Sequence, residues 1–328
     1  MRVLVTGGTG KVGSAVIERL VARGDEVVAL VRDVAAAREA LPAGVELARG
    51  DVTEPASLAA ACEGIEGVFN CMGIYEQWLP DDSRFEQVNA QGAMNVITAA
   101  RQAGARRAVH TSTFDVFHAD PGGTMTEADL ADYPKGTAYE RSKQHAEELV
   151  LAEARAGSPG LELVIVNPAG VYGPGRWASS GLDGGIRDAI RRRLPAVPPG
   201  GMTLGYVDDV ADGHVAAFDS GRPGARYILG DGFATMREIV ATAVEAAGRG
   251  FVPPTMPVPV AKALAAGGER VAGLIGRPPL LGGGQLHCLL WRARVDNSKA
   301  REELGLEFTD WREGIQRTVR WMEEIGRI

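Results

Sequence analysis

The sequence predicts an α/β protein with a doubly wound parallel sheet, followed by a smaller, discontinuous C-terminal lobe. Short β-branched runs alternate with longer helical patterns through the first half of the 328 residues, as in parallel sheets covered by helices. The first run leads directly into a glycine-rich turn that opens a helix. After Asn167-Pro168 the alternation fades into Gly/Pro-rich stretches, which suit irregular surface segments on a rigid scaffold.

The elements of the first half follow from these runs in order. The first helix follows the glycine turn and reaches Arg23-Gly24. The two longest helices are expected at 82–103 and 137–156, and each is followed by a glycine. The strands around them are expected at 3–5, 26–31, 45–48, 67–71, 107–111 and 161–166.

Further elements are expected in the second half, where they indicate that the chain returns to the sheet. These are a strand at 203–207, a helix from Asp209, a strand at 226–229 and a helix at 236–247. We therefore expect a main domain of residues 1–171, continued by about 203–250. Residues 172–202 and about 251–295 form the second lobe, and 296–328 add C-terminal helices.

Charge and hydropathy narrow the class of partner. A formal net charge of -7 and a pI of about 5.4 disfavour nucleic acid and anionic membranes, which attract basic surfaces. No run approaches the ~18 apolar residues that span a bilayer, and the apolar stretch after Arg2 is too short for a signal peptide. We expect a cytoplasmic protein with a small-molecule partner and no membrane partner, and a homodimer stays open.

Three cysteines make neither a disulfide framework nor a zinc site. Cys62, Cys71 and Cys288 are odd in number, widely separated and without CxxC or histidine spacing. We expect free thiols and no metal.

Three glycines mark an anion-binding turn. Gly7, Gly10 and Gly13 follow the first strand and open the first helix. The first allows a tight turn, the second lets backbone approach a pyrophosphate, and the third permits close helix packing. The spacing alone is a weak signal, but the strand before it and the helix after it favour dinucleotide binding over a plain glycine turn.

The motifs along the chain resemble those of the extended short-chain dehydrogenases/reductases, the NAD(P)-dependent epimerase/dehydratase family. Residues 6–13 match the TGxxGxxG pattern of that family. Further matches cover nearly the whole chain: Asp51-Val52, Asn89, Thr111-Ser112-Thr113, Tyr139 to Lys143, Asn167-Pro168 and Tyr206 to Val210. The dihydroflavonol-reductase-like and 3β-hydroxysteroid-dehydrogenase-like branches are the most similar in character. The resemblance implies a Rossmann domain that binds NAD(P) and a second lobe that binds substrate.

The resemblance also implies a set of cofactor contacts. They are Gly7, Thr9, Gly10, Lys11, Val12, Gly13, Asp51, Val52, Tyr139, Lys143, Asn167 and Pro168. Arg32 ends the second strand, where an acid would favour NAD and an arginine can bind the 2′-phosphate of NADP. We therefore expect NADP(H) as the preferred cofactor, while the following Asp33 leaves NAD(H) open.

Tyr139 and Lys143 are the expected catalytic pair. They are four residues apart on a predicted helix and share a face, where a cation can lower the pKa of the phenol. Such a phenol is a usable proton donor at neutral pH. The family places a Ser/Thr hydroxyl on the substrate carbonyl, and the resemblance gives Thr113 this role, with Ser112 as the alternative.

Aromatic residues near strand ends are expected to bind substrate. Tyr75 and Trp78 follow the fourth strand, and Tyr172 and Trp177 flank a Gly/Pro-rich turn. Ligands of such folds bind at the carboxyl ends of strands, so these residues could line an apolar pocket, or only pack loops.

The leading hypothesis is an NADPH-dependent oxidoreductase that reduces a ketone or aldehyde, or oxidises a secondary alcohol, of a small and partly apolar substrate. An NAD(P)-dependent nucleotide-sugar epimerase or dehydratase uses the same residues and is the first alternative. Residues 191–193, three arginines, could bind its diphosphate, or only end an exposed helix. A catalytically silent NADP-sensing regulator is the second alternative.

Overall fold

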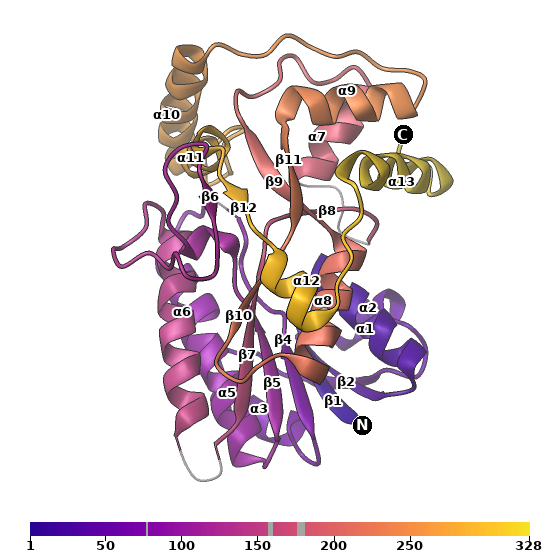
Figure 1. The fold of residues 1–328 in the computed structure, drawn as a ribbon, viewed down its shortest axis with the longest axis vertical. Coiled ribbons are helices and arrows are strands. Elements are labelled where there is room, and N and C mark those ends of the chain that lie inside the picture. The colour runs from indigo at the N-terminus through magenta and orange to yellow at the C-terminus, as the bar shows by residue number, and fades with distance from the viewer. Residues whose placement is uncertain (77, 157–159, 176–180) are drawn as a thin grey trace.

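A parallel sheet forms the centre of the molecule. In the computed structural model, which describes residues 1–76, 78–156, 160–175 and 181–328, seven strands pair in the order β10-β7-β5-β4-β1-β2-β3 (Figure 1). All neighbouring pairs are parallel. The strands are β1 (Arg2–Thr6), β2 (Glu26–Val31), β3 (Glu46–Arg49), β4 (Gly67–Asn70), β5 (Arg107–Thr111), β7 (Glu162–Pro168) and β10 (Arg226–Leu229). This confirms the predicted doubly wound fold.

The strand order places a topological switch point between the central strands β1 and β4. The chain proceeds outward from β1 to β3 and then returns to place β4 on the other side of β1. At such a switch point the connections leave in opposite directions, so a ligand fits between the carboxyl ends of the strands.

Helices cover both faces because successive strand residues point to opposite sides. Val3 and Val5 pack with α1 (Lys11–Arg23), α8 (Val207–Ser220) and α12 (Ser298–Leu304). Leu4 packs on the opposite face with α3 (Pro55–Ala61), α5 (Ala93–Gln102) and α6 (Ala138–Arg155). The short helix α2 (Val34–Ala40) follows β2.

The helix expected at 82–103 contains an irregular turn. It consists of α4 (Ser83–Phe85), the π-helix η1 (Glu86–Gly92) and α5. A π turn inserts an extra residue and is common near functional sites. Here it brings the buried Asn89 amide to the segment after β4.

A second, smaller sheet corrects one expectation. The strand expected at 203–207 forms as β9 (Gly201–Tyr206), but it pairs with β8 (Gly170–Tyr172) and β11 (Asp231–Thr235) and does not return to the main sheet. Its Leu204 and Tyr206 pack into the core of the smaller lobe with Tyr172 and Trp311. The edge position beside β7 is taken by β10.

The smaller lobe lies beyond the carboxyl ends of the main strands (Figure 1). It includes α7 (Gly181–Ile190), α9 (Met236–Ala246), α10 (Val258–Ile275), α11 (Gly283–Trp291) and α13 (Trp311–Glu324). The short turn η2 (Phe114–Val116) follows β5, and β6 (Thr124–Met125) pairs with β12 (Arg294–Val295). The division of the chain into lobes at the expected residues stays a prediction. Among the described residues, no helix combines the length and apolar character needed to cross a membrane.

Candidate active site

A cavity of about 1800 Å³ lies between the main sheet and the smaller lobe. Most of the site residues expected from the sequence line it. They are Gly7, Thr9, Gly10, Lys11, Val12, Gly13, Arg32, Asp51, Val52, Tyr75, Thr113, Tyr139, Lys143 and Pro168. Residues from both halves of the sheet therefore meet at the switch point between β1 and β4.

Four of the expected residues are not placed on this cavity. Asn167 is buried, and its amide donates to the Thr113 carbonyl (3.0 Å) and to Glu147 Oε1 (2.9 Å), so it joins β7 to neighbouring elements. Tyr172 is buried in the core of the smaller lobe and donates to the Trp311 carbonyl. Trp78 is half-buried outside the cavity lining, and Trp177 lies outside the described residues.

The glycine loop is shaped by steric exclusion. Gly7 has φ +67°, and a Cβ there would lie 2.7 Å from the Cys71 carbonyl oxygen. A Cβ on Gly13 would collide with the carbonyl of Gly7. Gly10 is the N-cap of α1, and no side chain caps this helix. Backbone N–H groups at this N-terminus can therefore bind an anion such as a pyrophosphate.

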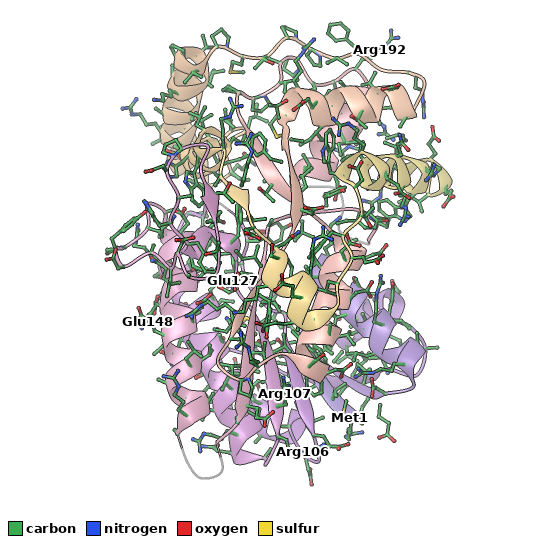
Figure 2. All side chains as sticks on the ribbon, in the orientation of Figure 1. Met1, Arg106, Arg107, Glu127, Glu148 and Arg192 are labelled. Carbon is green, nitrogen blue, oxygen red and sulfur yellow. The ribbon has the colours of Figure 1, made fainter. Side chains whose placement is uncertain are left out.

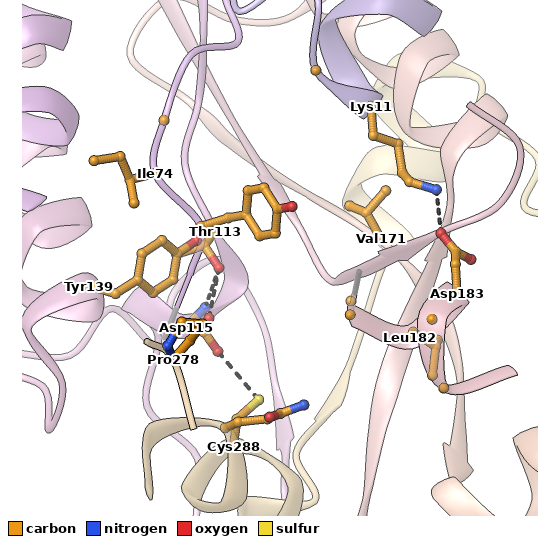
Figure 3. Close-up of a pocket in the computed structure, with 18 of the residues that line it drawn as sticks. Lys11, Ile74, Thr113, Asp115, Tyr139, Val171, Leu182, Asp183, Pro278 and Cys288 are labelled. Carbon is orange, nitrogen blue, oxygen red and sulfur yellow. Dashed lines mark hydrogen bonds and ion pairs between the residues drawn. The ribbon is translucent and has the colours of Figure 1, made fainter. Parts of the chain in front are cut away.

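Lys11 connects the glycine loop to the smaller lobe. Its ammonium forms an ion pair with Asp183 of α7 and donates to the Gly173 carbonyl at 2.5 Å (Figure 3). Asp183 is 2% exposed, and burial raises the pKa of its carboxyl despite the charge of Lys11. The first turn of α1 and the first turn of α7 are thus held together across the cavity.

Arg32 lies at the exposed end of β2 beside Asp51. Burial raises the pKa of Asp51, but hydrogen bonds from Thr53 and the charges of Arg32 and Arg84 outweigh it and lower the value. Asp33 accepts hydrogen bonds from the backbone N–H groups of Ala35 (3.0 Å) and Ala36 (3.1 Å), as the N-cap of α2. The carboxylate that could have favoured NAD is therefore engaged in capping.

The expected catalytic residues lie together on one cavity wall. A capping box of Thr137 and Glu140 starts α6 and places Tyr139 in its first turn. The Tyr139 side chain lies beside Thr113, which follows β5 (Figure 3). Lys143, one turn further along α6, donates from Nζ to the Thr111 carbonyl at 2.8 Å. The alternative hydroxyl, Ser112 Oγ, is buried without a hydrogen-bond partner in the described structure, so the geometry favours Thr113.

The expected lowering of the Tyr139 pKa is not found. Burial and the neighbouring Asp115 carboxylate raise the pKa of the phenol far above its usual value, although the nearby Thr113 hydroxyl opposes this. The Lys143 ammonium donates to the Thr111 carbonyl and does not reverse this rise in pKa. Burial lowers the pKa of Lys143 to about 8, against the opposing charge of Glu147. Tyr139 is therefore a neutral phenol at physiological pH, which is the form that donates a proton.

The sequence did not reveal the role of Asp115, whereas Asn89 stood among the motif residues. Asp115 lines the cavity two residues after Thr113 and accepts a hydrogen bond from its hydroxyl at 3.0 Å. Asn89 donates to the Ile74 carbonyl and to Ser142 Oγ, both at 3.0 Å, and so fixes the cavity segment after β4. The position of Asp115 in a short turn after the hydroxyl motif was the only signal for it.

The part of the lining that comes from the smaller lobe is rich in apolar side chains. Helix α10 packs through small residues, and larger side chains border the opening. The apolar lining includes Ile74, Phe114, Met202, Met236, Leu264, Val271, Ile275, Pro278, Leu280, Leu281 and Leu289. A carbonyl bound between Thr113 and Tyr139 would thus have an apolar remainder facing this part of the lining.

Comparison with known proteins identifies the family. Residues 3–230 match the NAD dependent epimerase/dehydratase family. "Sterol demethylase protein B" of Methylococcus capsulatus is 32% identical and covers 100% of both chains. A "Putative dihydroflavonol 4-reductase" of Synechocystis sp. is 29% identical over 99% of this chain and 95% of that protein. The NAD complex of Thermus thermophilus UDP-glucose 4-epimerase is 26% identical and superposes with a TM-score of 0.79 over 98% of this chain and 99% of that one. The chain therefore belongs to the NAD-dependent epimerase/dehydratase family and is an NAD(P)-dependent enzyme of the extended short-chain dehydrogenase/reductase type.

Proposed function

We propose that this protein is an NADPH-dependent reductase of a ketone or aldehyde carried by a bulky, largely apolar molecule. The observation that carries the proposal is the composition of a single cavity. The main domain contributes the glycine loop, Thr113, Tyr139 and Lys143, and the smaller lobe contributes a lining rich in aliphatic side chains. The same machinery run in reverse would oxidise a secondary alcohol.

The residues present fit a dinucleotide that carries a 2′-phosphate. The glycines let the loop fold tightly, because a Cβ on Gly7 or Gly13 would collide with backbone, and the N-terminus of α1 offers N–H groups that no side chain caps. Arg32 is exposed at the end of β2, where it can bind a 2′-phosphate, whereas Asp33 is engaged as an N-cap. When bound, this cofactor supplies the hydride.

The protein contributes proton transfer and electrostatic stabilisation. Tyr139 donates its proton to the carbonyl oxygen as negative charge develops there, and Thr113 donates a hydrogen bond to the same oxygen. An alkoxide is a stronger base than a phenolate, so the raised pKa of Tyr139 does not prevent this transfer. Lys143 would hold the nicotinamide ribose of the bound cofactor.

The apolar lining supports a substrate larger than a simple ketone. Leu264, Val271, Ile275 and Leu280 all line the cavity, and more than half of each remains exposed. A bulky apolar ligand would cover these side chains and gain about 25 cal/mol per Å² of apolar surface removed from water. The names of the two relatives refer to a sterol and a dihydroflavonol, which are multi-ring molecules of suitable size.

A nucleotide-sugar epimerase is the second candidate because arginines from the smaller lobe reach the cavity. Arg187, Arg193 and Arg277 line it, whereas Arg192 lies at the outer edge of the lobe (Figure 2). A guanidinium there could bind a diphosphate. The preponderance of aliphatic lining favours the reductase.

The two candidates differ in how the cofactor is used. Purified protein would be assayed for NADPH oxidation with ketones of increasing ring number, and separately for isomerisation of UDP-glucose. The proposal expects NADPH oxidation with a kcat/KM that rises with the apolar size of the ketone. It also expects that denaturing the purified protein releases no nicotinamide nucleotide. UDP-glucose isomerisation by protein that retains a nicotinamide nucleotide would establish the second candidate instead.

A further inference from the structure

Asp115 is a buried carboxyl group in direct contact with the expected catalytic hydroxyl. It lies in η2, is 7% exposed and lines the cavity. Its Oδ2 is 3.0 Å from Thr113 Oγ1, and its backbone N–H donates to the same oxygen at 3.3 Å. Figure 3 shows Asp115 beside Thr113 and Tyr139. Within the described part of the chain, no lysine or arginine forms an ion pair with this carboxyl.

The groups that face Asp115 do not supply a free cation. The Lys135 ammonium donates to the Phe117 carbonyl at 2.8 Å and lies 4.3 Å above the Trp291 ring. Glu140 and Tyr139 approach from α6, and the Cys288 thiol of α11 lies 3.9 Å from Oδ1. Burial and then the charge of Glu140 raise the pKa of Asp115 to about 7, opposed by Thr113, Lys135 and Cys288. Both protonation states are therefore populated near neutral pH.

The hydrogen bond between Asp115 and Thr113 has two mutually exclusive directions. A threonine hydroxyl carries one hydrogen. An ionised Asp115 can only accept, so it takes that hydrogen and leaves Thr113 with only lone pairs for the cavity. A protonated Asp115 can donate to Thr113 Oγ1, and the Thr113 hydrogen is then free for a substrate oxygen.

We propose that Asp115 is a positioning residue whose protonated carboxyl turns the Thr113 hydroxyl toward the substrate carbonyl. This inference rests on the proposed reduction of a carbonyl at the same site. Asp115 keeps its proton throughout, because the proton that ends on the product oxygen comes from Tyr139. The hydrogen-bonded pair of Asp115 and Thr113 thus acts as one donor, and it is switched off when Asp115 ionises.

The first test compares the pH dependence of reduction in wild type, Asp115→Asn and Asp115→Ala, with 1-decalone and NADPH as probes. An asparagine NH₂ group donates at every pH, so Asp115→Asn should retain kcat/KM within about threefold at pH 6. Lys143 titrates in both proteins, so its effect cancels when kcat/KM of Asp115→Asn is divided by kcat/KM of wild type. That ratio should rise about tenfold between pH 6 and 8. Asp115→Ala should lose kcat at both pH values with little change in KM.

A ratio that does not change with pH would overturn the proposal, as would an Asp115→Asn enzyme as impaired as Asp115→Ala at pH 6. Asp120→Asn, a change at an exposed aspartate outside the cavity lining, is the matched control and should behave as wild type. Thermal unfolding and NADPH affinity would verify that each variant is folded.

The second test needs no turnover and separates this proposal from the proposed function. The infrared difference spectrum of the protein between pH 6 and pH 8 should contain the C=O stretch of a protonated carboxylic acid. The band should be absent in Asp115→Asn, shifted in Thr113→Val and unchanged in Asp120→Asn. Absence of the band in wild type, or its persistence unshifted in Thr113→Val, would overturn the pairing whether or not any ketone is reduced. If the band behaves as expected but no ketone is reduced, the pairing stands and the proposed function fails.

Discussion

Thr113, Asp115 and Tyr139 lie together beyond β5, and hydrogen bonds join Thr113 to Asp115. The sequence motifs located Tyr139, Lys143 and Thr113, because their types and spacing follow the family pattern. Asp115 was not predicted, since an aspartate becomes unusual only when folding buries it beside other polar groups. The prediction that Lys143 lowers the Tyr139 pKa was wrong, because spacing along a helix does not determine the direction of the ammonium group.

The raised pKa of Asp115 predicts a pH-dependent cost in stability. Its pKa rises from the ordinary 3.8 to about 7 in the folded protein, so the stability it contributes in the protonated form is lost as pH rises between these values. The loss amounts to ~1.4 kcal/mol per pH unit, or ~4 kcal/mol in all. In urea unfolding, the free energy of unfolding of Asp115→Asn should rise relative to that of wild type between pH 4 and pH 7. Above pH 7 the difference between the two proteins should be constant. A difference independent of pH would contradict this.

Arg32 is expected to set cofactor preference. Arg32→Ala should weaken NADPH binding by roughly 1 to 3 kcal/mol, the scale of a lost charge-assisted hydrogen bond, and leave NADH binding unchanged. Fluorescence titration of both cofactors against wild type and variant measures this directly. Equal dissociation constants of wild type for NADPH and NADH would disprove the preference.

Tyr139 and Lys143 are expected to differ in what their removal affects. Tyr139→Phe should reduce turnover by about two to four decades with NADPH affinity nearly intact, because only the proton donor is lost. Lys143→Ala should reduce both turnover and affinity, since this side chain is proposed to hold the ribose. Near-normal turnover by Tyr139→Phe would show that the proton comes from elsewhere.

At the scale of elements, the sequence predicted best where structure depends on local pattern. The strands of the main sheet and helices α1 and α6 lie within a few residues of their expected bounds, because period-2 runs, caps and glycine stops are local signals. The π turn at Glu86–Gly92 was missed, since it depends on the contacts of Asn89 with Ile74 and Ser142. The prediction that β9 joins the main sheet was wrong, because the sheet to which a strand belongs depends on long-range packing.

The ion pair of Lys11 and Asp183 is expected to stabilise the contact between α1 and α7. Asp183→Ala leaves the Lys11 ammonium without its carboxylate in a largely buried position, which typically costs about 3 kcal/mol or more. Urea unfolding would measure this loss. Asp188→Ala on the same helix removes a partly exposed ion pair with Arg187 and should cost less than about 1 kcal/mol. Equal losses in the two variants would contradict a structural role for the buried pair.

At the scale of the molecule, the cavity joins two lobes with different tasks. The main domain supplies the glycine loop and the polar residues expected to be catalytic, and the smaller lobe supplies most of the apolar lining. The sequence predicted the first half of this arrangement from motifs. It misplaced Tyr172, and the apolar residues of α10 were not identified, because their role depends on where the smaller lobe lies over the sheet.

Net reduction by NADPH is the central claim, and transfer of deuterium from the cofactor tests it most directly. NADPH carrying deuterium at the transferable C4 position would be incubated with the protein and a multi-ring ketone, and the product examined by mass spectrometry. The account predicts one deuterium on the carbinol carbon of each product molecule and one NADPH consumed per product. Isomerisation of UDP-glucose with no net loss of reduced cofactor, together with no deuterium transferred to any ketone, would contradict it.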